Sequence, residues 1–413
     1  MWTTRTTIVM LMSGVATIAS LGQASALEAQ AFVDRLTAVY KSAGLDFEFG
    51  SATMDGDTII VDGVTISPEM HGGQDPMHFD TEITFSGVTE GDDGSYYADS
   101  ATIPDIETEF AADPKGEFSL KDIRIEDLYV PGEDPVPAIA NMQLMGAMST
   151  GALSVRRAGE EVIAFESFVN NYSYNPAQGS ADLVDMQSSV LISGIEADLS
   201  SVSEEDPGAG AIIDALGLSQ ISGDISQESS WSMADGHLTI DEFLFDFADV
   251  GALDIQAEVT GLTPAVIEQI VAMQANMEAG GEMTDEKAQA QMMQGMAIMQ
   301  GVSIVGASVR YDDASLASSL IDFFAAQSGA DRDTFVAGLK SMLPMMIGET
   351  GIPALKDIVV PPVESFLDNP ESLEVRIAPP SPTSALVLMA AAANPAGLIK
   401  ALGLVVEANM PLE

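Results

Sequence analysis

Cysteine is absent from this chain of 413 residues, and histidine, with 3 residues, and tryptophan, with 2, are scarce. The missing cysteine excludes a disulfide framework, thiolate metal ligands and a cysteine nucleophile. Basic residues are few as well: 15 Lys and Arg stand against 63 Asp and Glu, which gives a formal net charge of -48. Nucleic acid and anionic membrane surfaces are therefore poor partners, because phosphate binding requires clustered cations. Diffuse binding of cations to the acidic surface is expected instead.

Apolar residues are plentiful, at 46% of the chain, so a folded protein rather than a disordered one is expected. Residues 1–26 have the pattern of a secretory signal peptide: Arg5 supplies the positive charge, Ile8 to Leu21 is mostly apolar, and Ala24-Ser25-Ala26 suits signal peptidase. We predict cleavage after Ala26 and a periplasmic or secreted location. A retained membrane anchor is the alternative, although the run is short for a span of about 20 residues. The apolar run 385–393 is also too short, so no transmembrane segment is expected after cleavage.

Residues 27–262 carry mainly strand signals. A short helix is predicted first, because Phe32, Leu36 and Val39 recur at helical spacing. The stretch from Phe79 to Phe85 then alternates apolar with polar residues, which is the period of a strand with one buried and one solvated face. Turn signals separate such strands: Asp55-Gly56, Asp62-Gly63, Asp93-Gly94, Asn175-Pro176, Asp206-Pro207-Gly208 and Asp235-Gly236. This spacing without long helices predicts antiparallel meanders.

Residues 263–413 are predicted to be rich in helices. Thr263-Pro264 begins a helix, with Thr as the cap and Pro at the first helical position. The further helices predicted are one capped by Thr284, one capped by Asp312-Asp313, Thr334 to Ile347, Ala354 to Leu367 with a break near Pro361-Pro362, and Ser384 to Leu402. Strands are predicted at Val302 to Tyr311, Ser372 to Ile377 and Leu404 to Ala408. The whole chain is thus predicted to be α+β: an elongated, largely antiparallel β-sheet of hairpins with a helix-rich C-terminal half packed on it.

Catalytic signatures are few. His71 and His78, with acidic neighbours, allow a divalent-metal site, but their spacing matches no known ligand pattern and a flexible loop is the simpler interpretation. His237 is expected at a solvent-facing position where a strand begins. Gly-x-Ser-x-Gly is absent, and full calcium-loop patterns are absent too. Paired carboxylates are numerous enough to permit glycoside hydrolysis, but after signal cleavage Trp231 is the remaining tryptophan and sugar-binding platforms are lacking. No catalytic residue, metal site or cofactor is predicted.

Methionine is concentrated between Met273 and Met299. Met292, Met293, Met296 and Met299 form a stripe at helical spacing. Methionine is flexible and polarizable, so the stripe suits a surface that accepts varied apolar partners such as acyl chains or unfolded segments. The alternative is the ordinary core of a helical hairpin, and copper(I) capture is a third option that the absence of nearby His disfavours.

The order of features, together with several short motifs, resembles a known pattern. The motifs are Val309-Arg310-Tyr311-Asp312-Asp313-x-Ser315-Leu316, Phe366-Leu367-x-Asn369-Pro370, Pro379-Pro380-x-Pro382, Asn394-Pro395, Leu402-Gly403-Leu404 and Ala408-Asn409. The chain resembles an uncharacterised group of bacterial envelope proteins and, more loosely, the YdgA-like and AsmA-like exported proteins. The AsmA-like resemblance implies an elongated sheet with an apolar groove that handles lipids. The predicted cleavage of the amino-terminal helix departs from that group and argues against membrane-bridging transport.

These observations lead to one functional prediction and two alternatives. We predict an exported, acidic, non-enzymatic envelope protein that binds a lipid or another envelope protein through an apolar face. One alternative is a carboxylate-dependent hydrolase of envelope polymers. The other is a structural protein without a small ligand.

Overall fold

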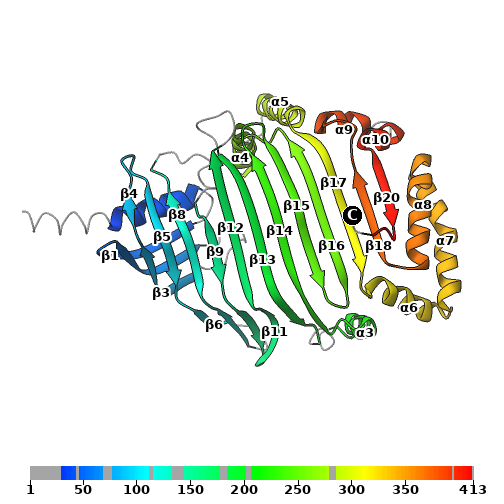
Figure 1. Cartoon of the computed structure of the whole chain (residues 1–413), viewed down its shortest axis with the longest axis horizontal. Coiled ribbons are helices and arrows are strands. Elements are labelled where there is room, and N and C mark those ends of the chain that lie inside the picture. The colour runs from blue at the N-terminus through cyan, green and yellow to red at the C-terminus, as the bar shows by residue number, and fades with distance from the viewer. Residues whose placement is uncertain are drawn as a thin grey trace, which may run out of the picture. The chain divides into compact units, whose positions relative to one another are not determined.

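The computed structural model describes residues 29–42, 46–67, 77–110, 115–132, 144–176, 184–200, 206–278, 285–392 and 395–411 (Figure 1). The structure combines helices with antiparallel strands, and the predicted α+β class is confirmed. The predicted signal peptide lies outside the described residues. The chain forms two compact units. We call residues 1–106 and 120–150 the N-terminal unit, and residues 107–119 and 151–413 the C-terminal unit.

The N-terminal unit consists of a helix on an antiparallel sheet. The helix spans residues 29–42, as the spacing of its apolar residues predicts. The strands are β1 (Asp46–Asp55), β2 (Thr58–Ser67), β3 (Met77–Ser86), β4 (Thr89–Glu90), β5 (Tyr96–Ile103), β8 (Ile123–Val130) and β9 (Ala147–Thr150). Hydrogen bonds pair them in the order β1–β2–β3–β5–β8–β9, with β4 alongside β5. Gly56 and Gly94, both with positive φ, occupy predicted turns.

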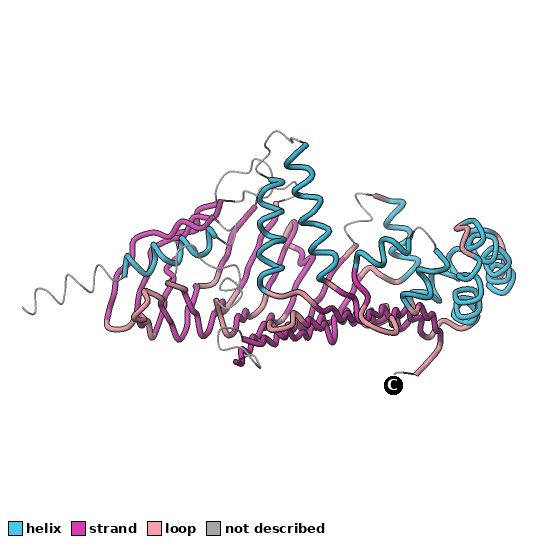
Figure 2. The backbone as a smooth tube through the Cα atoms, turned by 90° about the horizontal axis from the view of Figure 1, so that it is seen from above, coloured by secondary structure: helices cyan, strands magenta, loops and turns pink. Residues whose placement is uncertain are grey.

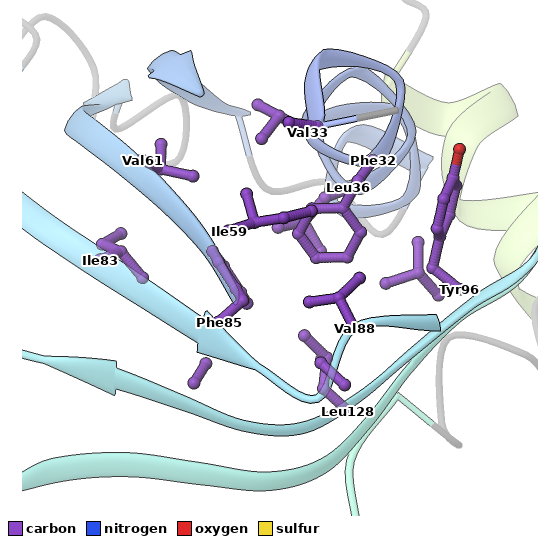
Figure 3. Close-up of a cluster of buried hydrophobic side chains, with 14 of the residues drawn as sticks. Phe32, Val33, Leu36, Ile59, Val61, Ile83, Phe85, Val88, Tyr96 and Leu128 are labelled. Atoms are coloured by element: carbon purple, nitrogen blue, oxygen red, sulfur yellow. The ribbon is translucent and has the colours of Figure 1, made fainter. Parts of the chain in front are cut away.

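The core of this unit lies between the helix and the sheet. Phe32 is fully buried and meets the ring of Phe85 edge-on, with the ring centroids 5.0 Å apart, and the ring of Tyr96 at 5.4 Å (Figure 3). Ile59 and Val61 of β2 point into the same cluster. The alternation along these strands therefore predicts their orientation correctly. The apolar positions face the helix and are withdrawn from water.

The C-terminal unit contains a wide antiparallel sheet. Its strands include β7 (Gly116–Leu120), β10 (Leu153–Arg157), β11 (Glu160–Phe165), β12 (Ser167–Pro176), β13 (Val184–Asp198), β14 (Gln220–Ser232), β15 (His237–Phe247), β16 (Gly251–Thr260), β17 (Ser303–Asp313), β18 (Ser372–Ile377), β19 (Thr383–Ser384) and β20 (Leu404–Ala408). Strand β6 (Ile106–Phe110) precedes β7. Both β11 and β12 pair with β13, and the order then runs β13–β14–β15–β16–β17–β18–β20.

Helices border this sheet at the strand ends and beside β20 (Figure 1). They are α3 (Pro207–Leu216), α4 (Pro264–Glu278), α5 (Asp285–Gly301), α6 (Leu316–Ser328), α7 (Arg332–Glu349), α8 (Pro353–Asp368), α9 (Ala385–Ala392) and α10 (Pro395–Leu402). The hairpin of α4 and α5 projects from the sheet (Figure 2). Within the described ranges, every helix falls short of the length or apolar character that a bilayer crossing requires.

Several local predictions were wrong. Asp206-Pro207-Gly208 begins helix α3 instead of forming a turn, because the Asp206 carboxylate accepts hydrogen bonds from the amides of Gly208 and Ala209. Asp62-Gly63 lies inside β2, where the register shifts at a bulge. Helix α8 continues through Pro361 and Pro362 without the predicted break, and the preceding Val360 is buried.

The division into compact units also differs from the predicted boundary at residue 262. Helices do begin there, but β16 and β17 on either side of it are hydrogen-bonded neighbours from Gly251↔Asp313 to Thr260↔Ser303. The sheet therefore continues from the predicted β-rich region into the predicted helix-rich region. The chain instead changes units around residues 107–119 and after Thr150.

Candidate functional site

The register of the C-terminal sheet places apolar side chains on one face. Residues directly opposite each other in an antiparallel ladder share a face, so rows of register partners can be followed across the sheet. The first row is Phe168, Ile192, Ile225, Phe245, Leu253, Tyr311, Leu373 and Ala408. The second is Ile255, Val309, Val375 and Val406, and the third is Ile240, Ala257, Ala307, Ile377 and Leu404. The fourth is Tyr174, Met186, Trp231, Leu238, Val259 and Ile304. We call these four rows the apolar face.

The opposite side of the same strands is polar. One row there runs from Ser226 through Leu244 to Asp254, Arg310, Glu374 and Glu407. One hollow on the sheet is lined by polar side chains, among them those of Asn171, Gln187 and Glu228. The sheet therefore separates an apolar face from a face that carries charge, as strands with a period of two predict.

The apolar face is not a closed core. Apart from Trp231, every residue of the four rows is half-buried or exposed. Val309 and its register partner Val375 are 45% and 42% exposed. A sheet face of this composition normally packs against a second layer of structure. Across most of this face, the described part of the C-terminal unit supplies no layer that buries the side chains.

Aromatic side chains contact one another along two strands of this side of the sheet. The rings of Phe243 and Phe245 lie 4.7 Å apart, and those of Tyr172 and Tyr174 stack at 6.3 Å. Burial raises the pKa of Tyr174 to about 12, because the phenolate would lose its hydration there. Burial, followed by a hydrogen bond to Asp313, also raises the pKa of Tyr311. A phenol with the ordinary pKa of about 10 is already neutral at physiological pH, and the raised pKa values extend the neutral state of both side chains to higher pH.

The helical hairpin begins at the border of this face. Trp231 is buried, and its Nε1 donates a hydrogen bond of 2.8 Å to the carbonyl oxygen of Leu262, just before α4. The predicted methionine stripe lies on α5: Met292, Met293 and Met296 are 62%, 60% and 37% exposed, and Met299 is half-buried. The structure thus places three of the four on the surface of the hairpin and not in a core between its two helices. Their role in binding stays a prediction.

A second methionine group was missed by sequence reasoning. Met342, Met345 and Met346 of α7 are all exposed. Their spacing of three and four residues puts them on one side of the helix, a signal that was present in the sequence. Exposed methionine is therefore a property of several helices in this unit, not of the hairpin alone.

His237 is half-buried, and its Nε2 lies 2.7 Å from Oε1 of Glu258. His237 is the first residue of β15 and its side chain is 38% exposed, in agreement with the predicted solvent-facing position at the start of a strand. His71 lies outside the described residues. Within the described ranges, no three His, Asp or Glu side chains are grouped so as to hold a metal ion.

Comparison with known proteins adds one observation. A family model described as "Uncharacterized protein" matches residues 244–409. The matched region runs from within β15 to the end of β20 and holds the hairpin, α6 to α10 and the larger part of the apolar face. It agrees over this region with the predicted resemblance to an uncharacterised group. No protein of curated function matches the chain.

Proposed function

We propose that this protein is an exported, non-enzymatic lipid-binding protein, and that the apolar face of the C-terminal unit holds the acyl chain of the lipid. The observation that carries the proposal is the first row of register partners, which is apolar across eight strands and whose residues are all only half-buried. An acyl chain that covers this surface removes apolar area of both partners from water. Each Å² of apolar area removed lowers the free energy of the complex by about 25 cal/mol.

The dimensions favour an acyl chain. Neighbouring strands lie about 4.8 Å apart, so a row that crosses eight strands is about 34 Å long. The hydrocarbon core of a bilayer is about 30 Å thick and contains two acyl chains end to end. One row is therefore longer than a single acyl chain, and adjacent rows provide width for a second.

Two further features support the proposal. The signal-like segment at residues 1–26 supports export to a compartment that contacts the cell envelope. The AsmA-like resemblance points in the same direction, because it implies an elongated sheet with a lipid-handling groove. Another envelope protein is the competing occupant of this face. The simplest alternative is a structural protein that binds no small ligand.

Native mass spectrometry of the protein, purified without detergent, tests the proposal first. Co-purifying acyl lipid is the expected result, and titration with a fluorescent long-chain fatty acid should then show saturable binding. Empty spectra, no lipid by solvent extraction and no saturable binding would overturn the proposal and favour the structural alternative.

A matched pair of variants locates the binding surface. Val309 of the apolar face and Leu191 of the opposite face are each 45% exposed. Val309→Glu places a charge on the apolar face and should weaken fatty-acid binding at least tenfold, because the charge must be desolvated. Leu191→Glu adds the same charge at equal exposure on the opposite face and should bind like the parent. Equal loss in both variants, or none in either, would contradict the assignment to this face.

A further inference from the structure

Helix α9 is unusual for a surface helix because all its residues are apolar. Its sequence is ALVLMAAA, yet Val387 and Met389 are 53% and 57% exposed. A helix that is apolar on all sides is normally buried in a core or in lipid. Here its outward side has no polar residue to present to water.

Helix α5 lies against α9 at the same edge of the sheet (Figure 1). Like Val387 and Met389 on α9, Met292, Met293 and Met296 on α5 are exposed. We call these five residues the α5–α9 surface. It is separate from the apolar face, which is formed by strands.

The charge pattern around the α5–α9 surface is distinctive. No charged residue occurs from 288 to 309 or from 377 to 399, although the whole chain is 19% charged with a net charge of -48. Residues 288–301 of α5 and the whole of α9 are therefore uncharged, whereas the first turn of α5 carries Asp285, Glu286 and Lys287.

We propose that the α5–α9 surface docks on a lipid bilayer whose headgroups carry no net charge. The uncharged edge complements such headgroups, whereas the acidic remainder of the protein is repelled by anionic lipid. Exposed Met and Val side chains enter the interfacial region, as the apolar side of an interfacial helix does. This docking does not depend on the proposed lipid site on the sheet, and each is tested separately.

A protein partner fits the surface less well. Methionine is common at protein interfaces, but their energetic hot spots are enriched in Trp, Tyr and Arg, and the five residues of the α5–α9 surface include none of these. A basic partner would find acidic residues in the first turn of α5, at Asp285 and Glu286, but none within the two uncharged stretches that carry the five side chains. A second copy of the chain brings another charge of -48 and gains no complementary charge.

Co-flotation of the purified protein with phosphatidylcholine vesicles tests this inference. The protein should float with these vesicles, and replacing part of the phosphatidylcholine by phosphatidylglycerol should reduce the floated fraction. The double variant Met293→Glu and Met389→Glu should lower the floated fraction at least tenfold. Circular dichroism should show the parent melting transition, since both side chains are exposed.

The matched control changes exposed methionines elsewhere. Met345→Glu and Met346→Glu on α7 add the same charge at 67% and 59% exposure, and this double variant should float like the parent. Absence of flotation with phosphatidylcholine, or equal loss in both double variants, would overturn the proposal. So would a concentration-dependent dimer that the Met293→Glu and Met389→Glu variant abolishes, because it would identify a second copy as the occupant. Fatty-acid titration of the same variant should be unchanged, which separates this surface from the sheet site.

Discussion

Arg310 and Asp312 form a two-pronged ion pair on strand β17, with Nε 2.8 Å from Oδ2 and Nη2 2.6 Å from Oδ1. The same guanidinium lies 3.6 Å from a Glu374 carboxylate oxygen on β18 and donates to the carbonyl oxygen of Met410 at 2.9 Å. Arg310 is buried, so its charge depends on these partners instead of water. One side chain of the polar face thus connects β17, β18 and the segment after β20.

Removing Arg310 is expected to be costly. Arg310→Ala should lower the free energy of unfolding by about 3 kcal/mol, because it leaves two carboxylates and a carbonyl group without their cation. Arg376→Ala is the control: Arg376 is exposed on the neighbouring strand and pairs with Glu374 and Glu407, so its loss should cost less than about 1 kcal/mol. Urea unfolding of both variants measures the difference, and equal costs would contradict the importance of burial.

Substitution of alanine for two glycines is expected to change protein stability in opposite directions. A Cβ atom at Gly50 would lie 1.7 Å from the carbonyl oxygen of Asp62, so Gly50→Ala must distort the β1–β2 ladder and should destabilise the N-terminal unit. Gly338 lies in helix α7 with open space around it. Gly338→Ala should raise stability by about 0.5–1 kcal/mol, because alanine loses less backbone entropy in a helix. Thermal unfolding followed by circular dichroism distinguishes the two signs.

Patterns of period two and helix capping predicted much of the fold. Strand β3 follows from the alternation between Phe79 and Phe85, and α4 begins at the predicted Thr263-Pro264. Helix α3 was missed because Asp-Pro-Gly is also a common turn sequence, although Gly217 in the left-handed conformation marks the helix end. Local signals do not show which strands pair. Strands β16 and β17, on either side of the predicted boundary at residue 262, are hydrogen-bonded neighbours.

The candidate surfaces were predictable only in part. Alternation in β16 indicates one apolar side, but the half-buried state of Leu253 depends on which elements cover the sheet, which a single strand does not reveal. The stripe of Met292, Met293 and Met296 was visible in the sequence, whereas its exposure was not. The contact between α5 and α9 joins segments far apart in the chain, and no local pattern specifies it.

The cap of helix α7 should make stability depend on pH. Asp331 accepts hydrogen bonds of 2.9 Å from the amide and from the hydroxyl of Thr334, and these bonds lower the pKa of its carboxyl group. A lowered pKa means that the folded state favours the carboxylate. The stabilisation is therefore present above the unfolded-state pKa of about 3.9 and is lost as pH falls through the lower folded-state pKa.

Asp331→Asn tests this cap, because asparagine also caps helices but does not titrate. The parent should be more stable than the variant at pH 7, and the difference should shrink at pH 3. Urea midpoints at both pH values provide the measurement. A difference that stays constant between pH 7 and pH 3 would show that ionisation of Asp331 does not contribute.

Peroxide oxidation of the folded protein should separate the methionines by exposure. Met292 and Met293 of α5 and Met345 of α7 are exposed, whereas Met233 is fully buried. The thioether must reach the oxidant to become a sulfoxide, so the exposed residues should react first and Met233 last. Peptide mapping by mass spectrometry after short peroxide treatment gives the order.

The same oxidation, measured with phosphatidylcholine vesicles present, tests whether the α5–α9 surface docks on a bilayer. If the α5–α9 surface docks on the bilayer, vesicles should slow the oxidation of Met293 and leave that of Met345 unchanged, because only the first enters the lipid interface. Met345 thus serves as an internal control for any loss of peroxide to the vesicles. Equal protection of both would indicate such a loss, and equal reactivity of Met233 and Met293 without vesicles would contradict the exposure of the hairpin itself.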